Sequence, residues 1–534
     1  MKRQNTALTL WHEDKLSFGF KAPLEMRPGE NDHVVSFEEH CAVTAKALML
    51  QGTGSDVGKS VLTAGLCRIA RRRGLKVAPF KPQNMSNNAA ACPDGGEIGR
   101  AQALQARAAG VTPTTDMNPV LLKPQTDRMA QVVVRGEALS TMEAMEYMAK
   151  RDTLLDTVVE SFETLCQQHD IVFVEGAGSP AEVNLRDRDI ANMGFARRVD
   201  VPVCLIGDID KGGVIASLVG TQSVISPEDA ALIKGFIINK FRGNLRLFDD
   251  GVHFIENRTN WPCFGVVPWL RATARLPAED AVSLQQASRA ETDAIKVVSP
   301  MFSRIANFDD ADPLRLEPGV DFHWIPPGQP LPLDADVIVL FGTKSTLGDL
   351  AFMKAQKWDQ DIYAHVRAGG RVLGICGGYQ MLGKTVFDPQ GYDGVPGTAE
   401  GLGLLDVETV MTGAKRVAKV GAVSPIDDNI LSGYEIHAGQ SYGPDTERPF
   451  FTVSGKPDGA TSPNGLIQGT YLHGVFSNDT FRQNWLRTVR QNFEGKLDYE
   501  LTVESALDEL ADGLEDALDL DALFDLASEP KFAR

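Results

Sequence analysis

The sequence contains few cysteines, and their spacing is not that of a paired framework. No C-x-x-C pattern occurs, so neither a set of disulfides nor a zinc site is indicated. We expect most of these thiols to be buried and unreactive. The seven cysteines are Cys41, Cys67, Cys92, Cys166, Cys204, Cys263 and Cys376.

Long apolar runs are also missing. No stretch approaches the roughly 18 apolar residues that a membrane-spanning helix needs. The basic start Met1-Lys2-Arg3 is followed by His12-Glu13-Asp14 before the apolar core of a signal peptide can form. The sequence therefore predicts a cytoplasmic protein that has no membrane partner.

Basic residues are outnumbered by acidic ones. The chain has 53 Lys and Arg against 71 Asp and Glu, which gives a net charge of −18. A broad basic face for a nucleic acid or an anionic membrane is therefore not expected.

Much of the negative charge lies near the C-terminus. Residues 500–529 contain eleven acidic residues and no lysine or arginine. Apolar residues recur among them at helical spacing, which predicts an amphipathic helix. Either this helix docks on its own protein or on a partner, or the segment is a frayed, solvated tail. The apolar positions are Val503, Leu507, Leu510, Leu514 and Leu518.

A chain of 534 residues is too long for one core, and we expect two large units or about three smaller ones. The pattern of the chain breaks near residues 276–293, and a new apolar run starts at Ile295. We assign a loosely ordered extension to residues 1–45, a first domain to 46–292, a second domain to 293–490, and an acidic helical tail to 491–534.

In the first domain, short apolar runs alternate with longer helical patterns. This alternation is typical of a parallel sheet covered by helices. Helices are expected over residues 141–168 and 212–224. The polar motifs follow the strand runs directly, where doubly wound sheets bind their ligands. The strand runs are 47–50, 77–80, 171–174, 203–206, 236–238 and 264–267.

A glycine-rich loop, GTGSDVGKS at residues 52–60, lies between the first strand run and a helical pattern. Inward-facing N–H groups and the positive end of the following helix bind phosphate oxygens in such a loop. Gly54 and Gly58 shape the loop, Lys59 reaches the outer phosphates and Ser60 reaches Mg²⁺. Thr53 stands where the strict P-loop has glycine, so the register is a variant. We interpret the loop as a nucleotide site rather than a turn that binds nothing.

Two further polar residues end strand runs of the same domain. Glu175 follows a buried run and precedes glycines, and beside a P-loop we favour a role in holding Mg²⁺, directly or through water, over a helix cap or solvated acid. Asn239 ends another run. It is either a reader of the adenine edge or a turn asparagine, and the sequence leaves both open.

The second domain contains a candidate nucleophile, Cys376, in the run RVLGICGGYQ at residues 371–380. Flanking glycines permit the strained strand-to-helix turn of a nucleophile elbow, and the N-terminus of the following helix favours the thiolate. A structural cysteine is rarely found in such a setting. We therefore expect Cys376 to be catalytic.

A thiolate nucleophile needs a base. His473, in GTYLHGVF at 469–476, is the better candidate, and His437 is the rival. Spacing does not decide between them, because such partners meet only in the fold. The turn at residues 342–344 is a weaker candidate for one backbone donor of an oxyanion hole, beside the donor that follows Cys376.

Taken together, these motifs resemble the cobyric acid synthase family. The resemblance rests on the P-loop, on KPQNMSNN at 81–88 and on EVNLRDRDIAN at 182–192, and it spans about residues 46–490. GICGGYQ and YLHG are similar to the cysteine and histidine motifs of class I-type glutamine amidotransferase domains. Val475 stands where most such domains have glutamate. The cobyric acid and cobyrinic acid a,c-diamide synthases also lack it, and what orients His473 stays open.

The resemblance implies an α/β fold with a dethiobiotin-synthetase-like P-loop domain followed by a class I-type glutamine amidotransferase domain. It implies amidation of the b, d, e and g carboxylates of adenosylcobyrinic acid a,c-diamide, with ATP, Mg²⁺ and glutamine-derived ammonia, in cobalamin biosynthesis. The first domain would make an acyl phosphate, while Cys376 releases ammonia through a thioester. Positive and amide donors for the polyanionic corrin are expected from five residues. These residues are Lys81, Gln83, Asn84, Asn87 and Asn88.

Two alternatives remain. A cobyrinic acid a,c-diamide synthase-like enzyme differs in the segment after the second strand, and the run 81–88 argues against it. A partitioning-type P-loop ATPase is a dimerising switch with an extra lysine near the start of the loop, where this chain has Gly52 and Thr53. Such a switch lacks an amidotransferase half and glutaminase activity. The sequence is compatible with a homo-oligomer but does not give the oligomeric state.

Overall fold

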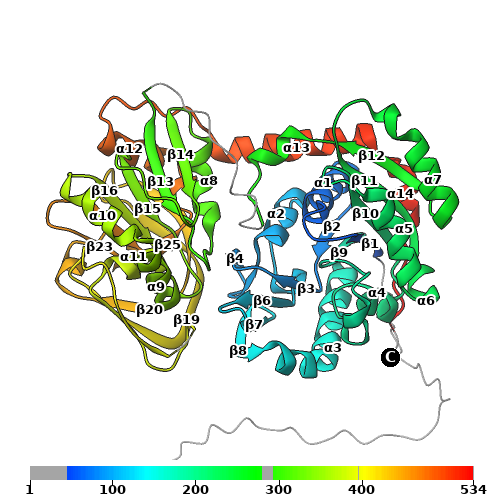
Figure 1. Ribbon diagram of the computed structural model, residues 1–534, viewed down its shortest axis with the longest axis horizontal. Coiled ribbons are helices and arrows are strands. Elements are labelled where there is room, and N and C mark those ends of the chain that lie inside the picture. Colours follow the sequence, from blue (N-terminus) through cyan, green and yellow to red (C-terminus); the bar gives the residue numbers. More distant parts are fainter. Residues whose placement is uncertain (1–44, 280–292, 395, 533–534) are drawn as a thin grey trace, which may run out of the picture. The chain divides into compact units, whose positions relative to one another are not determined.

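The computed structural model describes residues 45–279, 293–394 and 396–532 (Figure 1). These residues belong to one compact unit, 42–534. The predicted extension over residues 1–45 lies outside the described residues except for Ala45. Within the described ranges, we find no helix that combines the length and the apolarity needed to span a membrane.

A six-stranded parallel sheet forms the centre of the first half, in the order β12-β11-β10-β1-β9-β2. Each predicted strand run is found in one of its strands. The order changes direction at β1, and the P-loop follows β1 at this switch point, where open α/β sheets bind ligands. The strands are β1 (Lys46–Gly52), β2 (Val77–Phe80), β9 (Ile171–Glu175), β10 (Val203–Asp208), β11 (Ile233–Phe241) and β12 (Cys263–Pro268).

Helices cover this sheet, and two of them start later than predicted (Figure 1). The helix expected from Thr141 begins at Ala144, because residues 137–143 pair with a neighbouring strand instead. The helix expected from Gly212 begins at Val214, since Gly212 and Gly213 have φ of 78° and 73°. The helices are α1 (Lys59–Arg72), α2 (Arg100–Ala109), α3 (Ala144–Gln168), α4 (Met193–Val199), α5 (Val214–Val224), α6 (Pro227–Ala230) and α7 (Asp249–Thr259).

Two small sheets that the sequence did not predict lie between β2 and α3 in the chain. One is four-stranded, in the order β3-β6-β7-β8, and the other pairs β4 with β5. Strand β3 of the first sheet contains residues 83–85 of the KPQNMSNN run. Their strands are β3 (Gln83–Met85), β4 (Ala89–Ala91), β5 (Glu97–Gly99), β6 (Val120–Pro124), β7 (Met129–Val134) and β8 (Glu137–Glu143).

The second half is built on another six-stranded sheet, β14-β13-β15-β16-β24-β23, parallel except at β23. The helical segment between β15 and β16 is divided into two helices at Lys357, which has φ 65°. The elements are β13 (Ile295–Pro300), α8 (Asp312–Leu316), β14 (Val320–Ile325), β15 (Val337–Leu340), α9 (Thr346–Gln356), α10 (Trp358–Arg367), β16 (Arg371–Ile375), α11 (Gly377–Leu382), β23 (Ala460–Thr461), β24 (Ile467–Thr470) and α12 (Asp479–Val489).

A seven-stranded sheet follows, dominated by the long antiparallel pair β19 and β20. Its short strand β25 pairs with β20, which sets Tyr434 opposite His473. The strands are β17 (Thr385–Asp388), β18 (Gly397–Glu400), β19 (Glu408–Val423), β20 (Ile430–Tyr442), β21 (Phe451–Val453), β22 (Lys456–Asp458) and β25 (Leu472–His473).

The acidic C-terminal segment forms α13 (Tyr499–Ala517) and α14 (Leu520–Leu526), and α13 packs on α1 (Figure 1). The predicted apolar positions of α13 are buried in that contact. A Cβ on Gly65 of α1 would lie 2.3 Å from Leu514 Cδ1, so the two helices approach closely. Acidic residues pair with arginines: Asp508 with Arg68 at 2.8 Å, Asp512 with Arg72 at 2.6 Å and Glu504 with Arg107 at 2.8 Å.

Truncating this contact is expected to destabilise the protein. Leu510→Ala removes a fully buried side chain, and such changes cost about 2–5 kcal/mol. Leu501→Ala on the same helix is the matched control, because Leu501 is 61% exposed and surface changes stay within about 0.5 kcal/mol. Urea unfolding of both variants measures the difference. Equal unfolding midpoints would contradict the docking of α13.

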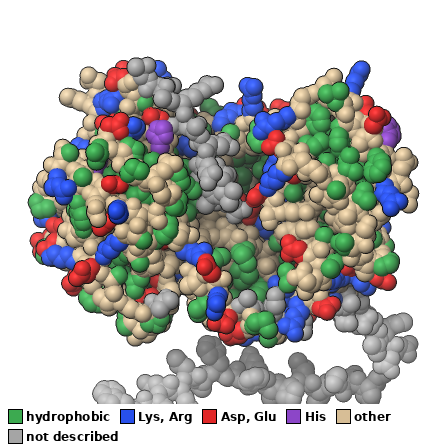
Figure 2. Space-filling view, in the orientation of Figure 1, with side chains coloured by type: hydrophobic (Ala, Val, Ile, Leu, Met, Phe, Trp, Pro, Cys, Tyr) green, Lys and Arg blue, Asp and Glu red, His purple; other side chains and the backbone are tan. Residues whose placement is uncertain are grey.

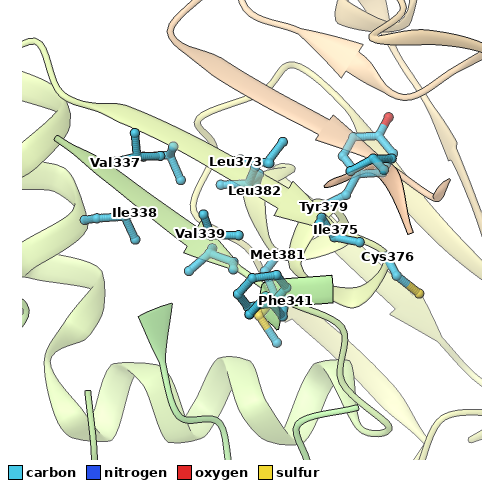
Figure 3. Close-up of a cluster of buried hydrophobic side chains, with 14 of the residues drawn as sticks. Val337, Ile338, Val339, Phe341, Leu373, Ile375, Cys376, Tyr379, Met381 and Leu382 are labelled. Carbon is cyan, nitrogen blue, oxygen red and sulfur yellow. The ribbon is translucent and has the colours of Figure 1, made fainter. Parts of the chain in front are cut away.

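On the face drawn in Figure 2, basic and acidic side chains are interspersed. The apolar core of the second half lies between β15, β16 and α11, and Cys376 stands at its edge with its sulfur pointing away from the cluster (Figure 3).

Candidate active sites

The P-loop connects β1 to α1 and is shaped by left-handed backbone at Asp56 and Gly58, with φ of 59° and 100°. Lys59 Nζ donates to Gly54 O at 2.9 Å and to Gly178 O at 3.2 Å. Burial lowers the pKa of Lys59 to about 8, although the carboxylate of Glu175 acts to raise it. Within the described part of the chain, the hydrogen bonds of the ammonium group thus go to carbonyl oxygens, at the point where the loop would bind phosphate.

Next to Lys59, a buried cluster joins one hydroxyl, one ammonium and two carboxylates. Ser60 Oγ lies 2.7 Å from Glu175 Oε1 and 2.5 Å from Glu279 Oε2, within hydrogen-bond distance of both carboxylates. Lys81 Nζ donates to Glu175 Oε1 at 2.9 Å and to Glu279 Oε1 at 2.8 Å. Burial opposes the charged form of Lys81, but the two carboxylates leave its pKa raised.

Sequence reasoning assigned Glu279 only to the domain boundary, whereas the structure places its carboxylate on Ser60. The only indication of this role in the sequence was an acidic residue within the run LPAED at 276–280. Its distance in the chain from the P-loop hid the contact.

The oxygens of Ser60 and Glu175 fit a magnesium ion that is shared with a nucleotide. Across the described ranges, no group of three or more His, Cys, Asp or Glu side chains makes a metal site by itself. Mg²⁺ is commonly held by one or two carboxylates together with phosphates and waters, so a nucleotide would supply the missing ligands. The adjoining cleft has a volume of about 860 Å³, which lies within the usual range for small-molecule sites.

Asn239 is buried beneath the P-loop. Its Nδ2 donates to Val57 O at 2.8 Å, and its Oδ1 accepts from Lys240 N at 2.9 Å. Both polar atoms therefore support the protein's own backbone, as expected of a turn asparagine. Contact with an adenine edge stays a prediction.

Side chains of the KPQNMSNN run mostly bind protein groups. Asn84 Nδ2 donates to Gln102 Oε1 at 3.0 Å, and Asn88 Nδ2 donates to Ala278 O at 3.1 Å. Lys81, Gln83 and Asn84 line the 860 Å³ cleft. Their contact with a corrin stays a prediction.

Cys376 lies on a strained turn between β16 and α11, with φ 53° and ψ −111°. This positive φ confirms the elbow geometry that the sequence predicted. Glycine is required beside it, since a Cβ on Gly378 would lie 1.9 Å from Leu340 O. The thiol contacts Ile436 O at 3.5 Å.

His473 lies in the same cavity as Cys376 and is oriented by Asp310. His473 Nδ1 is 2.6 Å from Asp310 Oδ2, and Asp310 Oδ1 accepts from Gly474 N at 2.6 Å. Burial alone would lower the pKa of His473, but Asp310, with a smaller effect of Cys376, raises it to about 10. Its Nε2 makes no hydrogen bond of ordinary geometry within the described residues. The imidazole therefore presents Nε2 while Nδ1 is fixed.

Asp310 is the residue that orients His473, which the sequence did not identify. It comes from the short 3₁₀ helix η6 (Phe308–Ala311), far upstream in the chain. Val475, at the place of the usual glutamate, is fully buried. The pair of acids at 309–310, soon after a strand run, was the only sequence signal.

His437 lines the cavity too, but its ring nitrogens face other groups. Nδ1 is 2.9 Å from Gly439 O, and Nε2 is 3.5 Å from Glu435 Oε1. Its ring stacks on Tyr471 with centroids 4.0 Å apart. The geometry favours His473 over His437 as the base.

The turn at residues 342–344 borders this cavity, which has a volume of about 100 Å³. Lys344 N donates to Arg304 O at 2.9 Å, so its N–H is occupied. Thr343 N faces Gly377, since a Cβ there would lie 3.0 Å from it. Thr343 is thus the member of the turn best placed to act with the N–H of Gly377.

Both halves match family models. Residues 48–284 match the CobQ/CobB/MinD/ParA nucleotide binding domain, and residues 296–481 match the CobB/CobQ-like glutamine amidotransferase domain. These matches confirm the fold class predicted for each half.

Whole-chain relatives agree. The chain is 62% identical over 488 residues to the cobyric acid synthase of Hyphomonas neptunium, covering 91% of this chain and 99% of that protein. It is 60% identical over 484 residues to the cobyric acid synthase of Paracoccus denitrificans, covering 90% and 99%. Because these matches span nearly the full relatives, the chain belongs to the cobyric acid synthase family, glutamine amidotransferases of cobalamin biosynthesis.

Proposed function

We propose that the protein amidates the b, d, e and g carboxylates of adenosylcobyrinic acid a,c-diamide, using ATP and ammonia from glutamine. The observation that carries this proposal is the buried His473–Asp310 pair beside the Cys376 elbow, in a chain that also holds a P-loop cleft. The amidotransferase half, matched over residues 296–481, is what a partitioning ATPase lacks. That alternative is not retained.

In the second half, the Cys376 thiolate attacks the side-chain carbonyl carbon of glutamine. The oxyanion that forms is stabilised by the N–H groups of Thr343 and Gly377. His473 gives a proton from Nε2 to the departing nitrogen, so ammonia leaves and a thioester remains. Water then attacks the thioester, and glutamate is released.

The charges around this cavity suit a free amino acid. Lys123, Lys344 and Lys415 line it together with Asp393. Burial lowers the pKa of Lys415 to about 7, and Lys123 is paired with Glu97. Lys344 and Asp393 therefore complement the α-carboxylate and α-ammonium groups of glutamine.

In the first half, a substrate carboxylate attacks the γ-phosphorus of ATP, and ADP leaves. Lys59 neutralises charge on the transferring phosphoryl group. Ser60 and Glu175 would hold Mg²⁺, which would neutralise charge on the phosphate oxygens of ATP. Ammonia then displaces phosphate from the acyl phosphate to give the amide. We propose that the protein acts in the cytoplasm, as the sequence predicts.

Mass spectrometry of the corrinoid product tests this function. Incubation with adenosylcobyrinic acid a,c-diamide, glutamine and Mg-ATP is expected to replace four carboxyls by carboxamides, with nitrogen taken from ¹⁵N-amide glutamine. Cobyrinic acid serves as the comparison substrate. Amidation of cobyrinic acid only at positions a and c would instead identify the a,c-diamide synthase reaction.

A further inference from the structure

Arg100 is the first residue of α2, and its guanidinium is buried against the amidotransferase half. Arg100 Nη2 donates to Tyr434 Oη at 2.6 Å and lies 2.8 Å from Asp309 Oδ2. The same nitrogen is 3.2 Å from Ala89 O. The guanidinium carbon is also 5.3 Å from the centre of the Tyr434 ring. One cation thus holds two side chains of the other half.

Both partners of Arg100 adjoin the catalytic histidine. The Tyr434 ring stacks on the His473 ring, with centroids 5.0 Å apart and planes 10° apart. Asp309 immediately precedes Asp310, whose carboxylate binds His473 Nδ1. Arg100 therefore contacts the support of His473 on two sides, although it does not touch the reacting atoms.

The next turns of α2 contact the phosphate site. Gln105 Nε2 donates to Glu175 Oε2 at 2.6 Å and to Ser60 O at 3.2 Å. Gln102 Nε2 lies 3.4 Å from the same carboxylate oxygen. A helix of ten residues is about 15 Å long at 1.5 Å per residue, so one rigid element reaches both centres.

Charge explains why this arginine matters. Asp309 is buried beside Asp310, and burial raises its pKa to about 6 although Arg100 acts to lower it. Without the guanidinium, a second buried carboxylate would stand uncompensated next to Asp310, so Asp309 would take up a proton or move. Tyr434 would lose one of two donors to its hydroxyl at the same time, since Asn307 Nδ2 also donates to it at 2.9 Å. The ring that stacks on His473 and the residue next to Asp310 would thus each lose a contact.

We propose that Arg100 is a positioning residue of the glutaminase centre, and that α2 links the placement of His473 to the state of the phosphate site. The inference rests on the proposed function. It predicts that the two activities respond differently to a change at Arg100: glutamine hydrolysis falls, whereas amidation from ammonium does not.

The first test compares Arg100→Met with Arg100→Lys and with Arg107→Met. Arg107 lies on the same helix but pairs with Glu500 and Glu504 of α13, so it is the matched control. Arg100→Met should lower kcat for glutamine hydrolysis about 10- to 100-fold, part of the 10²–10⁴-fold that a placed acid or base contributes. The rate of ammonium-dependent amidation should stay within about twofold of the wild-type rate, which is small beside the contribution of a placed acid or base. Arg100→Lys should recover part of the loss, and Arg107→Met should behave as wild type.

A second readout separates positioning from general damage. The rate of Cys376 alkylation by iodoacetamide, followed against pH, reports the thiolate that His473 stabilises. Arg100→Met should move the midpoint of this profile to higher pH, whereas loss of stability alone would not. Tyr434→Phe removes only the hydroxyl and keeps the stacked ring, so it should shift the midpoint in the same direction by less. This variant keeps the test decisive if Arg100→Met does not fold.

The link through α2 has its own measurement. Adding Mg²⁺ and a non-hydrolysable ATP analogue should change the alkylation rate of wild-type Cys376, and Arg100→Met should abolish that response. An unshifted alkylation profile in both variants, or equal loss of glutamine and ammonium use, would overturn the positioning role. An analogue without effect on the wild type would overturn the link. A failure of the proposed function would be seen separately: the wild-type enzyme would hydrolyse glutamine but make no amidated corrinoid.

Discussion

Replacing Cys376 by serine is expected to abolish amidation from glutamine and to leave amidation from ammonium intact. A serine hydroxyl is far less acidic than a thiol, so His473 would not generate the nucleophile. We expect the glutamine-dependent rate to fall by about three orders of magnitude or more, as for other units of nucleophile and base. The first half should be unaffected, because it needs only ammonia.

The measurement is product formation by each variant with glutamine alone and with ammonium alone. Ammonium is supplied at raised pH, where free NH₃ is appreciable. Cys263→Ser is the matched control, since this free, half-buried thiol lies in β12 near no proposed catalytic residue. His473→Ala should behave as Cys376→Ser does.

His437→Ala distinguishes the two histidines. It should keep glutamine use, because its nitrogens face Gly439 and Glu435. Glutamine use at the wild-type rate by Cys376→Ser would contradict the proposed division of labour. So would a failure of ammonium to rescue Cys376→Ser and His473→Ala, if both are folded and bind ATP.

The sequence predicted those features of the site that depend on short stretches of chain. The six strand runs of the first sheet were found because parallel strands buried on both faces read as continuous apolar runs. The positive φ of Cys376 followed from its glycine neighbours. The P-loop was readable for the same reason, since its glycines, lysine and serine are consecutive.

Partners that meet only in the fold were not predicted. Asp310 orients His473 across 163 residues, and Glu279 reaches Ser60 across 219. The contact of Arg100 with Tyr434 spans 334 residues. In each case the residue is an ordinary charged side chain in its local sequence. Its role appears only when the sheets bring distant loops together.

Apolar periodicity also missed the antiparallel strands. In β19, a single face is buried over only part of its length, so buried, half-buried and exposed residues do not alternate strictly. The amphipathic spacing in the acidic tail was clear, whereas its partner was not. The arginines of α1 and α2 that pair with α13 lie more than 390 residues away, and Arg275, which pairs with Glu509, lies 234 residues away.

Lys59→Ala is expected to abolish amidation from either nitrogen source. Lysines that line the cleft at the phosphate site differ in what balances their charge. Lys81 is already paired with Glu175 and Glu279, and Lys211 and Lys240 also pair with carboxylates. Among the described residues, Lys59 Nζ donates only to the carbonyl oxygens of Gly54 and Gly178. The charge of Lys59 is therefore available to the transferring phosphoryl group.

Loss of this charge should lower the rate of amidation by several orders of magnitude, because phosphoryl transfer depends on positioning and charge neutralisation. The assay is amidation with glutamine and with ammonium, read beside glutamine hydrolysis by the same variant. Lys234→Ala, on the exposed side of β11, is the control and should behave as wild type. Glutamine hydrolysis should persist in Lys59→Ala, since Cys376, His473 and Asp310 are untouched.

Because Cys376→Ser is rescued by ammonium and Lys59→Ala is not, the two variants together assign ammonia release to one half and carboxylate activation to the other. Near-normal amidation by folded Lys59→Ala would contradict the assignment of the P-loop to phosphoryl transfer.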